Sequence, residues 1–190
     1  MLGRNGDVSF RNDASIDPKH LVLRCSNNHV EIAEVPGKSG GYRRIRKTIE
    51  VNAGDVIFAG EQYLVIDDGN RTRESVAAAE TDAPEETFGT PLPPPQLHVT
   101  QLLANGLPGR VASTDKTTLT IGREGSDLSF PHDRFMSGRH LRIDNESGAL
   151  KVTDVGSLNG TFSRVVDVPQ RLAVGDEVMI GSVLFRIDYA

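Results

Sequence analysis

The stretch GREGSDLSFPHDRFMSGRHLRI, residues 122–143, has a close copy in GRNGDVSFRNDASIDPKHLVLR, residues 3–24. Allowing one gap after Gly6, nine positions are identical: Gly3/Gly122, Arg4/Arg123, Gly6/Gly125, Asp7/Asp127, Ser9/Ser129, Phe10/Phe130, Asp13/Asp133, His20/His140 and Leu21/Leu141. The similarity continues in VEIAEV (30–35) against LKVTDV (150–155), and in 54–60 against 175–181. The chain therefore contains two copies of one unit, since self-similarity at a fixed offset indicates a repeat.

The apolar residues of both copies predict β-strands. They alternate with polar residues or form short runs between Gly, Asn, Asp and Pro, a pattern typical of short antiparallel strands and tight turns. Neither copy contains a helical stripe of apolar residues lasting three turns. The chain has 19 Gly, 10 Pro and no Trp, which agrees with many turns. We expect an all-β fold, with two antiparallel β-sandwich domains.

A polar segment separates the two copies. Residues 67–96 contain seven acidic and two basic residues, few aliphatic residues and a Pro-rich end. Such a segment buries too little apolar surface to offset the entropy lost on ordering, so we expect a flexible linker. The predicted organisation is a first domain at 1–68 (the first repeat), a linker at 69–96 and a second domain at 97–190 (the second repeat).

The repeats differ at their beginnings. Residues 97–120 contain two further predicted strands, with a turn at Asn105-Gly106, before the second Gly-Arg. Only Met1 and Leu2 stand at that place in the first repeat. We therefore expect an N-terminally truncated first domain with an exposed sheet edge, which is liable to pair with another chain. A strand-exchanged dimer is the alternative.

Composition excludes several classes of protein. The 190 residues carry 21 basic and 26 acidic side chains, a net charge of −5, which argues against a nucleic-acid partner. The one cysteine, Cys25, allows no intrachain disulfide and fits the cytoplasm. No apolar run long enough to span a membrane and no signal peptide is present. We expect no cofactor and no metal, because His132, Asp133 and His140 form no closed ligand set.

Four features of the second repeat suit an anion: Arg123, Ser137, Arg139 and the turn GSLNGT at 156–161. A guanidinium can donate two N–H bonds to phosphate oxygens, a hydroxyl can donate another, and turn amides or Asn159 add more. Each feature taken singly also has an ordinary interpretation, as a solvated charge, a turn residue or a plain hairpin. Together they predict a pocket for one phosphate.

In their order and spacing these residues resemble a forkhead-associated (FHA) domain across nearly all of 97–190: Gly122-Arg123, Ser137-x-x-His140, Asp154-x-x-Ser157-x-Asn159-Gly160-Thr161, Leu172-x-x-Gly175-Asp176 and Gly181. The resemblance implies a β-sandwich that binds phosphothreonine peptides across loops at one end. By position, Arg123 and Ser137 would bind the phosphate, Arg139 could add a contact and Asn159 would hold the peptide backbone, with Thr161 in the same set. Structural support would come from Gly122, His140 and Gly160. Leu158 departs from the Ser or Thr often found in the family, which puts one contact in doubt.

The first repeat keeps Arg4 and His20 but changes three site positions: Asp17 stands for Ser137, Gly40 for Asn159 and Tyr42 for Thr161. A carboxylate facing a phosphate replaces a donor by a like charge. We therefore expect no phosphate binding there, with Asp17 paired internally to Arg4. The basic run 43–47 is interpreted as a solvated strand face, or alternatively as a docking surface for an acidic partner.

The predicted function is a phosphothreonine-dependent peptide-binding module that mediates protein–protein interaction in cytoplasmic Ser/Thr kinase signalling. The partner would be a protein phosphorylated on threonine by an upstream kinase. A phosphorylated linker threonine (Thr81, Thr87 or Thr90) could also bind to the site within the same chain. A phosphate-independent scaffold of a larger assembly is the alternative. An enzyme is not expected: Ser137, His140 and Asp154 contain the residue types of a triad, but no G-x-S-x-G motif is present and alternation sends the first two side chains apart.

Overall fold

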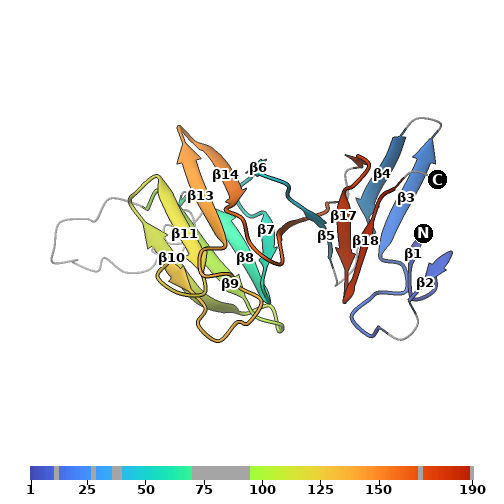
Figure 1. Cartoon of the computed structure of the whole chain (residues 1–190), viewed down its shortest axis with the longest axis horizontal. Helices are drawn as coiled ribbons and strands as arrows, with labels where there is room; N and C mark the ends of the chain where they lie inside the picture. Colours follow the sequence, from blue (N-terminus) through green and yellow to red (C-terminus); the bar gives the residue numbers. More distant parts are fainter. Residues whose placement is uncertain (11–12, 27–28, 36–39, 70–94, 167–168, 189–190) are drawn as a thin grey trace, which may run out of the picture. The chain divides into compact units, whose positions relative to one another are not determined.

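The computed structural model describes residues 1–10, 13–26, 29–35, 40–69, 95–166 and 169–188, and it confirms the all-β class (Figure 1). Most of the predicted linker, residues 70–94, lies outside the described residues. Within the described ranges, no helix is long and apolar enough to cross a membrane.

The chain forms two compact units, and each unit draws on both repeats. Unit 1 consists of residues 1–44 and 162–190, and unit 2 consists of residues 45–161. These bounds differ from those of the repeats, 1–68 and 97–190. Unit 2 combines the second half of the first repeat with the first half of the second repeat. Unit 1 combines the two remaining halves. Figure 1 shows this by colour, with the red β17 and β18 in the same unit as the blue β3 and β4.

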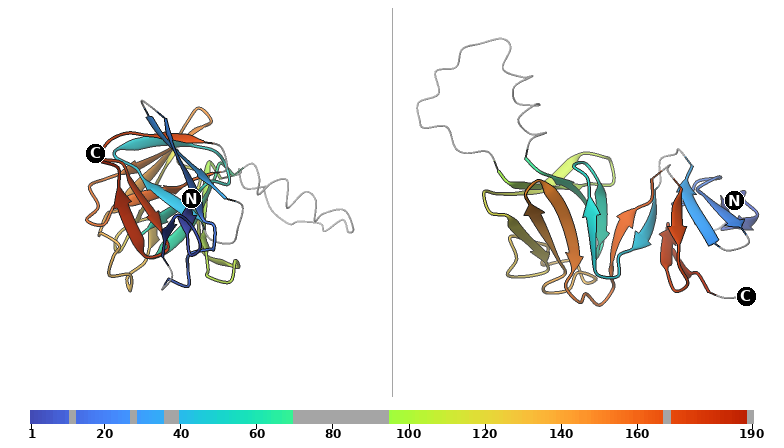
Figure 2. Two further views of the ribbon diagram at one scale, coloured as in Figure 1. Left: turned by 90° about the vertical axis from the view of Figure 1, so that its right-hand side faces the viewer. Right: turned by 90° about the horizontal axis from the view of Figure 1, so that it is seen from above.

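Unit 2 has two sheets, visible from other sides in Figure 2. One has the strand order β12-β11-β13-β14-β6, and the other includes β10-β9-β8-β7. The strands are β6 (Thr48–Val51), β7 (Val56–Ala59), β8 (Gln62–Asp67), β9 (Leu97–Leu102), β10 (Pro108–Thr114), β11 (Thr118–Gly122), β12 (Leu128–Ser129), β13 (Leu141–Glu146) and β14 (Ala149–Asp154).

Unit 1 repeats this plan with the roles of the repeats reversed. Its sheets have the orders β16-β4-β3-β1-β2 and β15-β5-β17-β18. The strands are β1 (Leu2–Gly3), β2 (Val8–Ser9), β3 (Leu21–Ser26), β4 (His29–Glu34), β5 (Gly41–Arg44), β15 (Thr161–Arg164), β16 (Gln170–Leu172), β17 (Glu177–Ile180) and β18 (Val183–Arg186).

Each unit has its own hydrophobic core. Alternation along the strands sends every second side chain inward, as in β13, where Leu141, Ile143 and Asn145 are buried. The unit 2 core joins residues of both repeats, among them Ile57, Leu64, Leu119 and Val152. The unit 1 core is smaller: Leu2, Ile16, Leu21, Ile32, Val165, Leu172, Val178 and Ile180.

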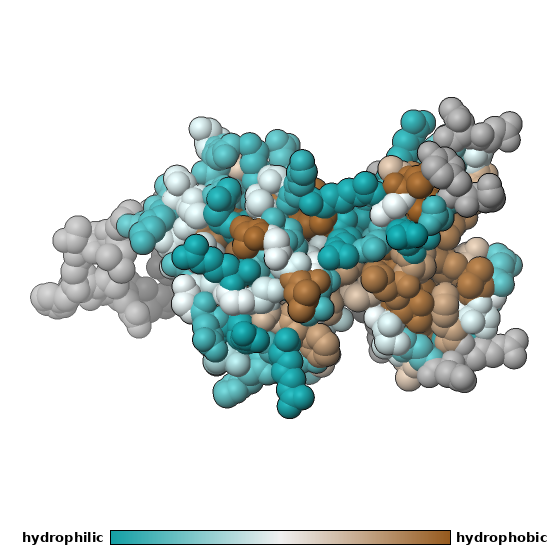
Figure 3. Space-filling model, in the orientation of Figure 1, coloured by the Kyte–Doolittle hydropathy of each residue, from teal (hydrophilic) through white to brown (hydrophobic). Residues whose placement is uncertain are grey.

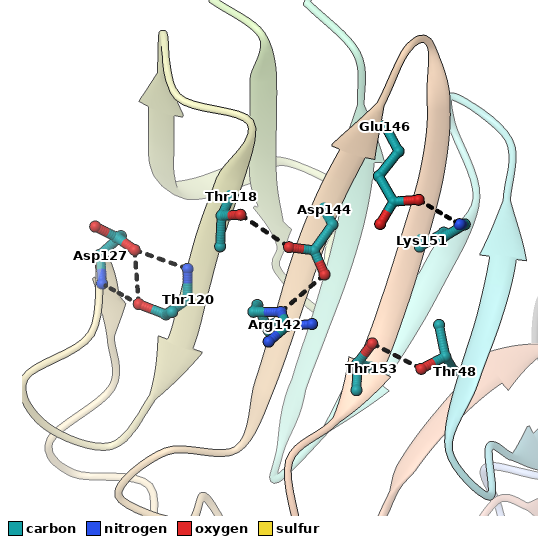
Figure 4. A network of polar contacts seen from close by, with 9 residues as sticks. All are labelled: Thr48, Thr118, Thr120, Asp127, Arg142, Asp144, Glu146, Lys151 and Thr153. Atoms are coloured by element: carbon teal, nitrogen blue, oxygen red, sulfur yellow. Dashed lines mark hydrogen bonds and ion pairs between the residues drawn. The ribbon is translucent and has the colours of Figure 1, made fainter.

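The exchange is seen most directly where β6 of the first repeat pairs with β14 of the second. The hydroxyls of Thr48 and Thr153 lie 2.9 Å apart across this pair (Figure 4). In unit 1 the reciprocal pair joins β16 to β4.

Charge complementarity favours these exchanged pairs. Lys151 lies opposite Glu50 in unit 2, and Arg171 lies opposite Glu31 in unit 1. Pairing within each repeat would instead put Lys151 opposite Arg171 and Glu31 opposite Glu50. Opposite charges across neighbouring strands stabilise a sheet by about 0.2–1 kcal/mol, whereas like charges destabilise it.

Candidate functional site

Three loops meet at one end of unit 2. The loop after β11 begins at Arg123, the long connection between β12 and β13 contains Ser137 and Arg139, and the turn after β14 contains Asn159. Arg123, Arg139 and Asn159 are exposed and Ser137 is half-buried. Four of the five residues predicted from sequence to bind the peptide therefore lie on neighbouring loops of one unit.

Ser137 connects the three loops. The backbone N–H of Arg123 donates to the Ser137 carbonyl at 2.8 Å, and the backbone N–H of Leu158 donates to the Ser137 Oγ at 3.0 Å. Because this oxygen accepts a bond from inside the protein, its own proton can be donated to a bound anion. The loop positions on either side are fixed before a ligand arrives, which lowers the ordering cost of binding.

The turn residue Asn159 is also held in place. Its side-chain Nδ2 donates to the carbonyl of Phe135 at 2.8 Å. Among the described residues this is the one hydrogen bond of that carboxamide, so its oxygen and second N–H can bind the backbone of a peptide.

His140 is fully buried beneath these loops. Its Nδ1 accepts the backbone N–H of Ser137 at 3.0 Å, so the ring proton is on Nε2, which donates to the carbonyl of Gly160 at 3.0 Å. Burial lowers the pKa of His140, outweighing the Gly160 carbonyl and the carboxylates of Asp154 and Asp133, which act to raise it. The neutral ring in this tautomer therefore links the loop of Ser137 to the turn that contains Gly160.

Asp154 organises the turn that carries Asn159. Its carboxylate accepts the Ser157 hydroxyl at 2.6 Å, the Thr161 hydroxyl at 2.7 Å and the backbone N–H groups of Gly156 and Ser157. Burial acts to raise the pKa of Asp154, but these hydrogen bonds outweigh it and the pKa is lowered. Thr161 was predicted among the peptide-binding residues; it is fully buried and its hydroxyl is bonded to Asp154, so it supports the turn from inside.

Two glycines are required by the local geometry. A Cβ on Gly122 would lie 2.0 Å from the carbonyl oxygen of Gly138, so only glycine lets these two loops approach. Gly160 has a φ of +88°, in the region that side chains disfavour.

Asp133 was not predicted to support the site, yet it anchors the loop that carries Ser137. Its Oδ1 accepts the N–H groups of Phe135 and Met136 at 2.9 and 3.1 Å. Its Oδ2 accepts the backbone N–H of Glu61 at 2.8 Å and the side-chain amide of Gln62 at 2.7 Å. The turn between β7 and β8 of the first repeat therefore supports a loop of the second. The identity of Asp13 and Asp133 in the repeat alignment was a sequence signal that could have indicated this structural role.

The geometry does not form a hydrolase triad. Neither ring nitrogen of His140 bonds the Ser137 hydroxyl, since Nδ1 accepts the backbone N–H and Nε2 faces Gly160. A nucleophile needs its base within hydrogen-bond reach. Over the described ranges, no group of three or more His, Cys, Asp or Glu residues could hold a metal ion.

The first repeat keeps part of this framework in unit 1. The backbone N–H of Asp17 donates to Nδ1 of His20 at 3.1 Å, and the N–H of Arg4 donates to the Asp17 carbonyl at 3.0 Å. The side-chain ion pair between Asp17 and Arg4 stays a prediction.

One assignment in the repeat alignment needs correction. The reciprocal pairing of β5 with β15 relates Tyr42 to Phe162, not to Thr161. Gly40 then corresponds to Gly160, and the position matching Asn159 lies outside the described residues. The sequence comparison was one residue out of register; the corrected register aligns the identical residues Gly40 with Gly160 and Arg44 with Arg164.

Two residues of the basic run 43–47, those that belong to unit 1, are paired with acidic side chains. Arg43 and Arg44 form ion pairs with Asp176 and Glu177 of β17, at 2.7 and 2.6 Å. These contacts favour the interpretation as a partly solvated strand face over a docking surface for an acidic partner.

Comparison with known proteins agrees with this site. Residues 119–181 match the sequence model of the FHA domain family. Over 74 residues the chain is 41% identical to an oxoglutarate dehydrogenase inhibitor of Corynebacterium diphtheriae, covering 38% of this chain and 50% of that protein. It is 43% identical over 74 residues to the glycogen accumulation regulator GarA of Mycolicibacterium smegmatis, covering 38% and 46%.

The corresponding protein of Mycobacterium tuberculosis is 39% identical over the same length, covering 38% and 44%. The chain thus spans about half the length of the curated relatives it matches. It contains one FHA domain at 119–181, a phosphopeptide-binding module related to these proteins over the shared region.

Proposed function

We propose that the site formed by Arg123, Ser137 and Asn159 binds phosphothreonine peptides and so mediates regulated protein–protein interaction. The observation that carries the proposal is the junction at Ser137, which is hydrogen-bonded to the loops of Arg123 and Leu158 while its hydroxyl proton can still be donated. A dianion needs several charge-assisted donors at fixed positions, which this arrangement supplies.

Each side chain has a separate role in the proposed complex. The guanidinium of Arg123 supplies charge and a two-pronged donor, with Arg139 as a further cation on the same loops. Ser137 donates its hydroxyl, and the Asn159 carboxamide binds the peptide backbone. The exposed apolar side chains of Leu158 and Phe135, 85% and 51% accessible, flank these groups and offer contacts to peptide side chains.

The test is a titration of one peptide in three forms, carrying phosphothreonine, phosphoserine or unmodified threonine, followed by fluorescence anisotropy. We expect binding of the phosphothreonine form in the micromolar range and at least tenfold weaker binding of the other two. Arg123→Ala should lower affinity at least tenfold, because a hydrogen bond to a charged group contributes about 1.5–3 kcal/mol. The matched control is Arg142→Ala, an exposed arginine of β13 that pairs with Asp144 away from the loops.

Equal binding of phosphorylated and unmodified peptides would favour the alternative, a phosphate-independent scaffold. Unit 1 is the part to which that alternative best applies, since Asp17 stands at the position of Ser137. We propose that the first repeat is a degenerate copy that binds no phosphate.

The proposed partners are phosphothreonine proteins modified by an upstream Ser/Thr kinase in the cytoplasm. The relatives named as regulators support this, because the region they share with this chain includes the proposed site. Thr81, Thr87 and Thr90, the candidate intrachain ligands, lie outside the described residues. Their capture is checked by phosphorylating the chain and measuring whether binding of a free phosphopeptide weakens.

A further inference from the structure

The exchange of halves brings a segment of the first repeat to the candidate site. The connection between β5 and β6 lies beside the turn that contains Asn159. At one end of this turn, Ile45 donates its backbone N–H to the carbonyl of Thr161 at 2.9 Å. At the other end, Asp154 donates its N–H to the carbonyl of Lys47 at 3.0 Å. Both ends of the turn are therefore hydrogen-bonded to the first repeat.

The strand order places Lys47 at the same end of unit 2 as the candidate site. Part of the sheet has the order β11-β13-β14-β6, and β6 runs antiparallel to β14, so the start of β6 lies beside the end of β14. Arg123 follows β11 and Lys47 precedes β6, so three strand spacings separate them. At about 4.8 Å per spacing this is about 14 Å, which an extended peptide covers in about four residues.

Lys47 is available to a ligand. Its side chain is exposed, and among the described residues it forms no ion pair. The basic run that Lys47 ends is different at its start, where Arg43 and Arg44 are paired with acidic side chains of β17. Arg43 and Arg44 thus contribute to a strand face of unit 1, whereas Lys47 adds a positive charge to the loops of unit 2.

Exposed charges at this end of unit 2 are mostly positive. The loops concerned are the three that carry the candidate site, the β5–β6 connection and the turn between β7 and β8, all among the described residues. Their exposed charged side chains are Arg46, Lys47, Arg123, Arg134 and Arg139 against Glu61, Glu124 and Asp127. The whole chain, by contrast, has a net charge of −5. A group of cations of this kind attracts an acidic partner.

Apolar groups are less prominent on the surface of unit 2. On the face visible in Figure 3, most atoms of this unit are teal or white, and brown atoms form small separate patches. That face therefore presents mainly polar and charged groups to a partner.

The exchange is what supplies the charge of Lys47. In unit 1 the equivalent bond runs from the N–H of Glu34 to the carbonyl of Val166 at 3.1 Å, so Val166 corresponds to Lys47. Two separate domains, each made of one repeat, would place this uncharged residue beside the Asn159 turn. Lys47 also lies outside residues 119–181, which match the FHA family. The family motif alone therefore gives no indication of its role.

We infer that the site prefers phosphothreonine peptides with an acidic side chain about four residues from the phosphothreonine, and that Lys47 binds this side chain. The inference rests on the proposed function of the site. The peptide would run from Arg123 across the Asn159 turn toward Lys47. Because exposed ion pairs are weak, each well-placed acidic residue should raise affinity about two- to fivefold.

The test uses the whole chain and synthetic phosphothreonine peptides with otherwise uncharged flanks. Glu, Gln or Lys is placed singly at successive positions on either side of the phosphothreonine, and affinity is measured by fluorescence anisotropy. At low salt the Glu peptide should bind about two- to fivefold more tightly than the Gln peptide when the substitution is about four residues away on one side. The Lys peptide should bind more weakly than both, and high salt should remove the differences.

Variants of the protein assign the preference to one side chain. Lys47→Met keeps the aliphatic stem and should bind the Glu and Gln peptides equally well. Lys47→Glu should reverse the preference, so that the Lys peptide binds more tightly than the Glu peptide. Lys116→Met is the matched control, because Lys116 is an exposed lysine of unit 2 that precedes β11, at the opposite end of that strand from Arg123. It should retain the preference for Glu.

The outcomes separate this inference from the proposed function. If no phosphothreonine peptide binds, the proposed function fails and the inference fails with it. Equal binding of the Glu, Gln and Lys peptides would leave phosphothreonine recognition intact and overturn the inference alone. A preference for Glu that Lys47→Met retains in full would also overturn it, because other cations would then be responsible.

Discussion

The carboxylate of Asp133 accepts a hydrogen bond from the side-chain amide of Gln62 at 2.7 Å, joining residues 71 positions apart. Asp133 holds the loop of Ser137, while Gln62 belongs to the first repeat and lies outside the FHA match at 119–181. The candidate site therefore depends on a segment that carries none of its ligand-facing residues.

Gln62→Ala should destabilise unit 2 and weaken phosphopeptide binding. It removes one of the donors to a buried carboxylate, and a hydrogen bond to a charged group contributes about 1.5–3 kcal/mol. Urea unfolding measures the stability and peptide titration the affinity. Gln170→Ala, at a half-buried position of unit 1, is the control and should leave binding unchanged. If both variants bind equally well, the turn does not support the site.

Cysteine pairs distinguish the exchanged arrangement from two independent repeats. In a Cys25→Ser background, Lys151→Cys with Glu50→Cys should form an intrachain disulfide, because these residues are opposite each other on β14 and β6. Lys151→Cys with Arg171→Cys should not. Non-reducing electrophoresis and mass spectrometry at low protein concentration measure both, and cross-linking of the second pair alone would contradict the exchange.

Gly122→Ala should destabilise unit 2 by about 1–3 kcal/mol or more, since the added methyl group would lie 2.0 Å from a carbonyl oxygen. It should also weaken peptide binding, because Arg123 follows directly. Gly138→Ala is the matched control: nothing lies within 4 Å of its Cβ. Denaturant midpoints give the comparison, and equal stability of the two variants would show that the loops can separate without cost.

Stability should fall as the pH drops below about 6.5, in part through His140. Its pKa in the folded protein lies below the ordinary value of 6.5, so the unfolded chain takes up a proton first. This contribution is complete above 6.5 and is lost as the pH falls toward the folded pKa. Protonation also places a proton on Nδ1, where the Ser137 N–H must bind.

Urea unfolding between pH 7.5 and 5.5 checks this expectation. His140→Gln should be less stable than the wild type at pH 7.5 but should show a shallower loss, whereas His132→Gln, an exposed histidine, should follow the wild type. Parallel losses in all three proteins would show that other groups cause the pH dependence.

Much of the fold and site could be predicted from local pattern. Alternating apolar residues predicted short strands. The ordered motifs predicted that Arg123, Ser137 and Asn159 lie on neighbouring loops, since the strand order places these loops at one end of the sandwich. Buried roles were harder to predict. Thr161 and Asp133 carry polar groups that look available in a sequence, and only their neighbours in space show that those groups are already bonded.

The sequence by itself predicted an all-β chain, which the structure confirms, and it also predicted an internal repeat and a set of candidate site residues. Only the tertiary structure decided which half of each copy packs with which. Both pairings bury similar apolar faces, so hydrophobic pattern cannot choose between them. The choice depends on which residues become cross-strand neighbours, such as Lys151 opposite Glu50 and Arg171 opposite Glu31.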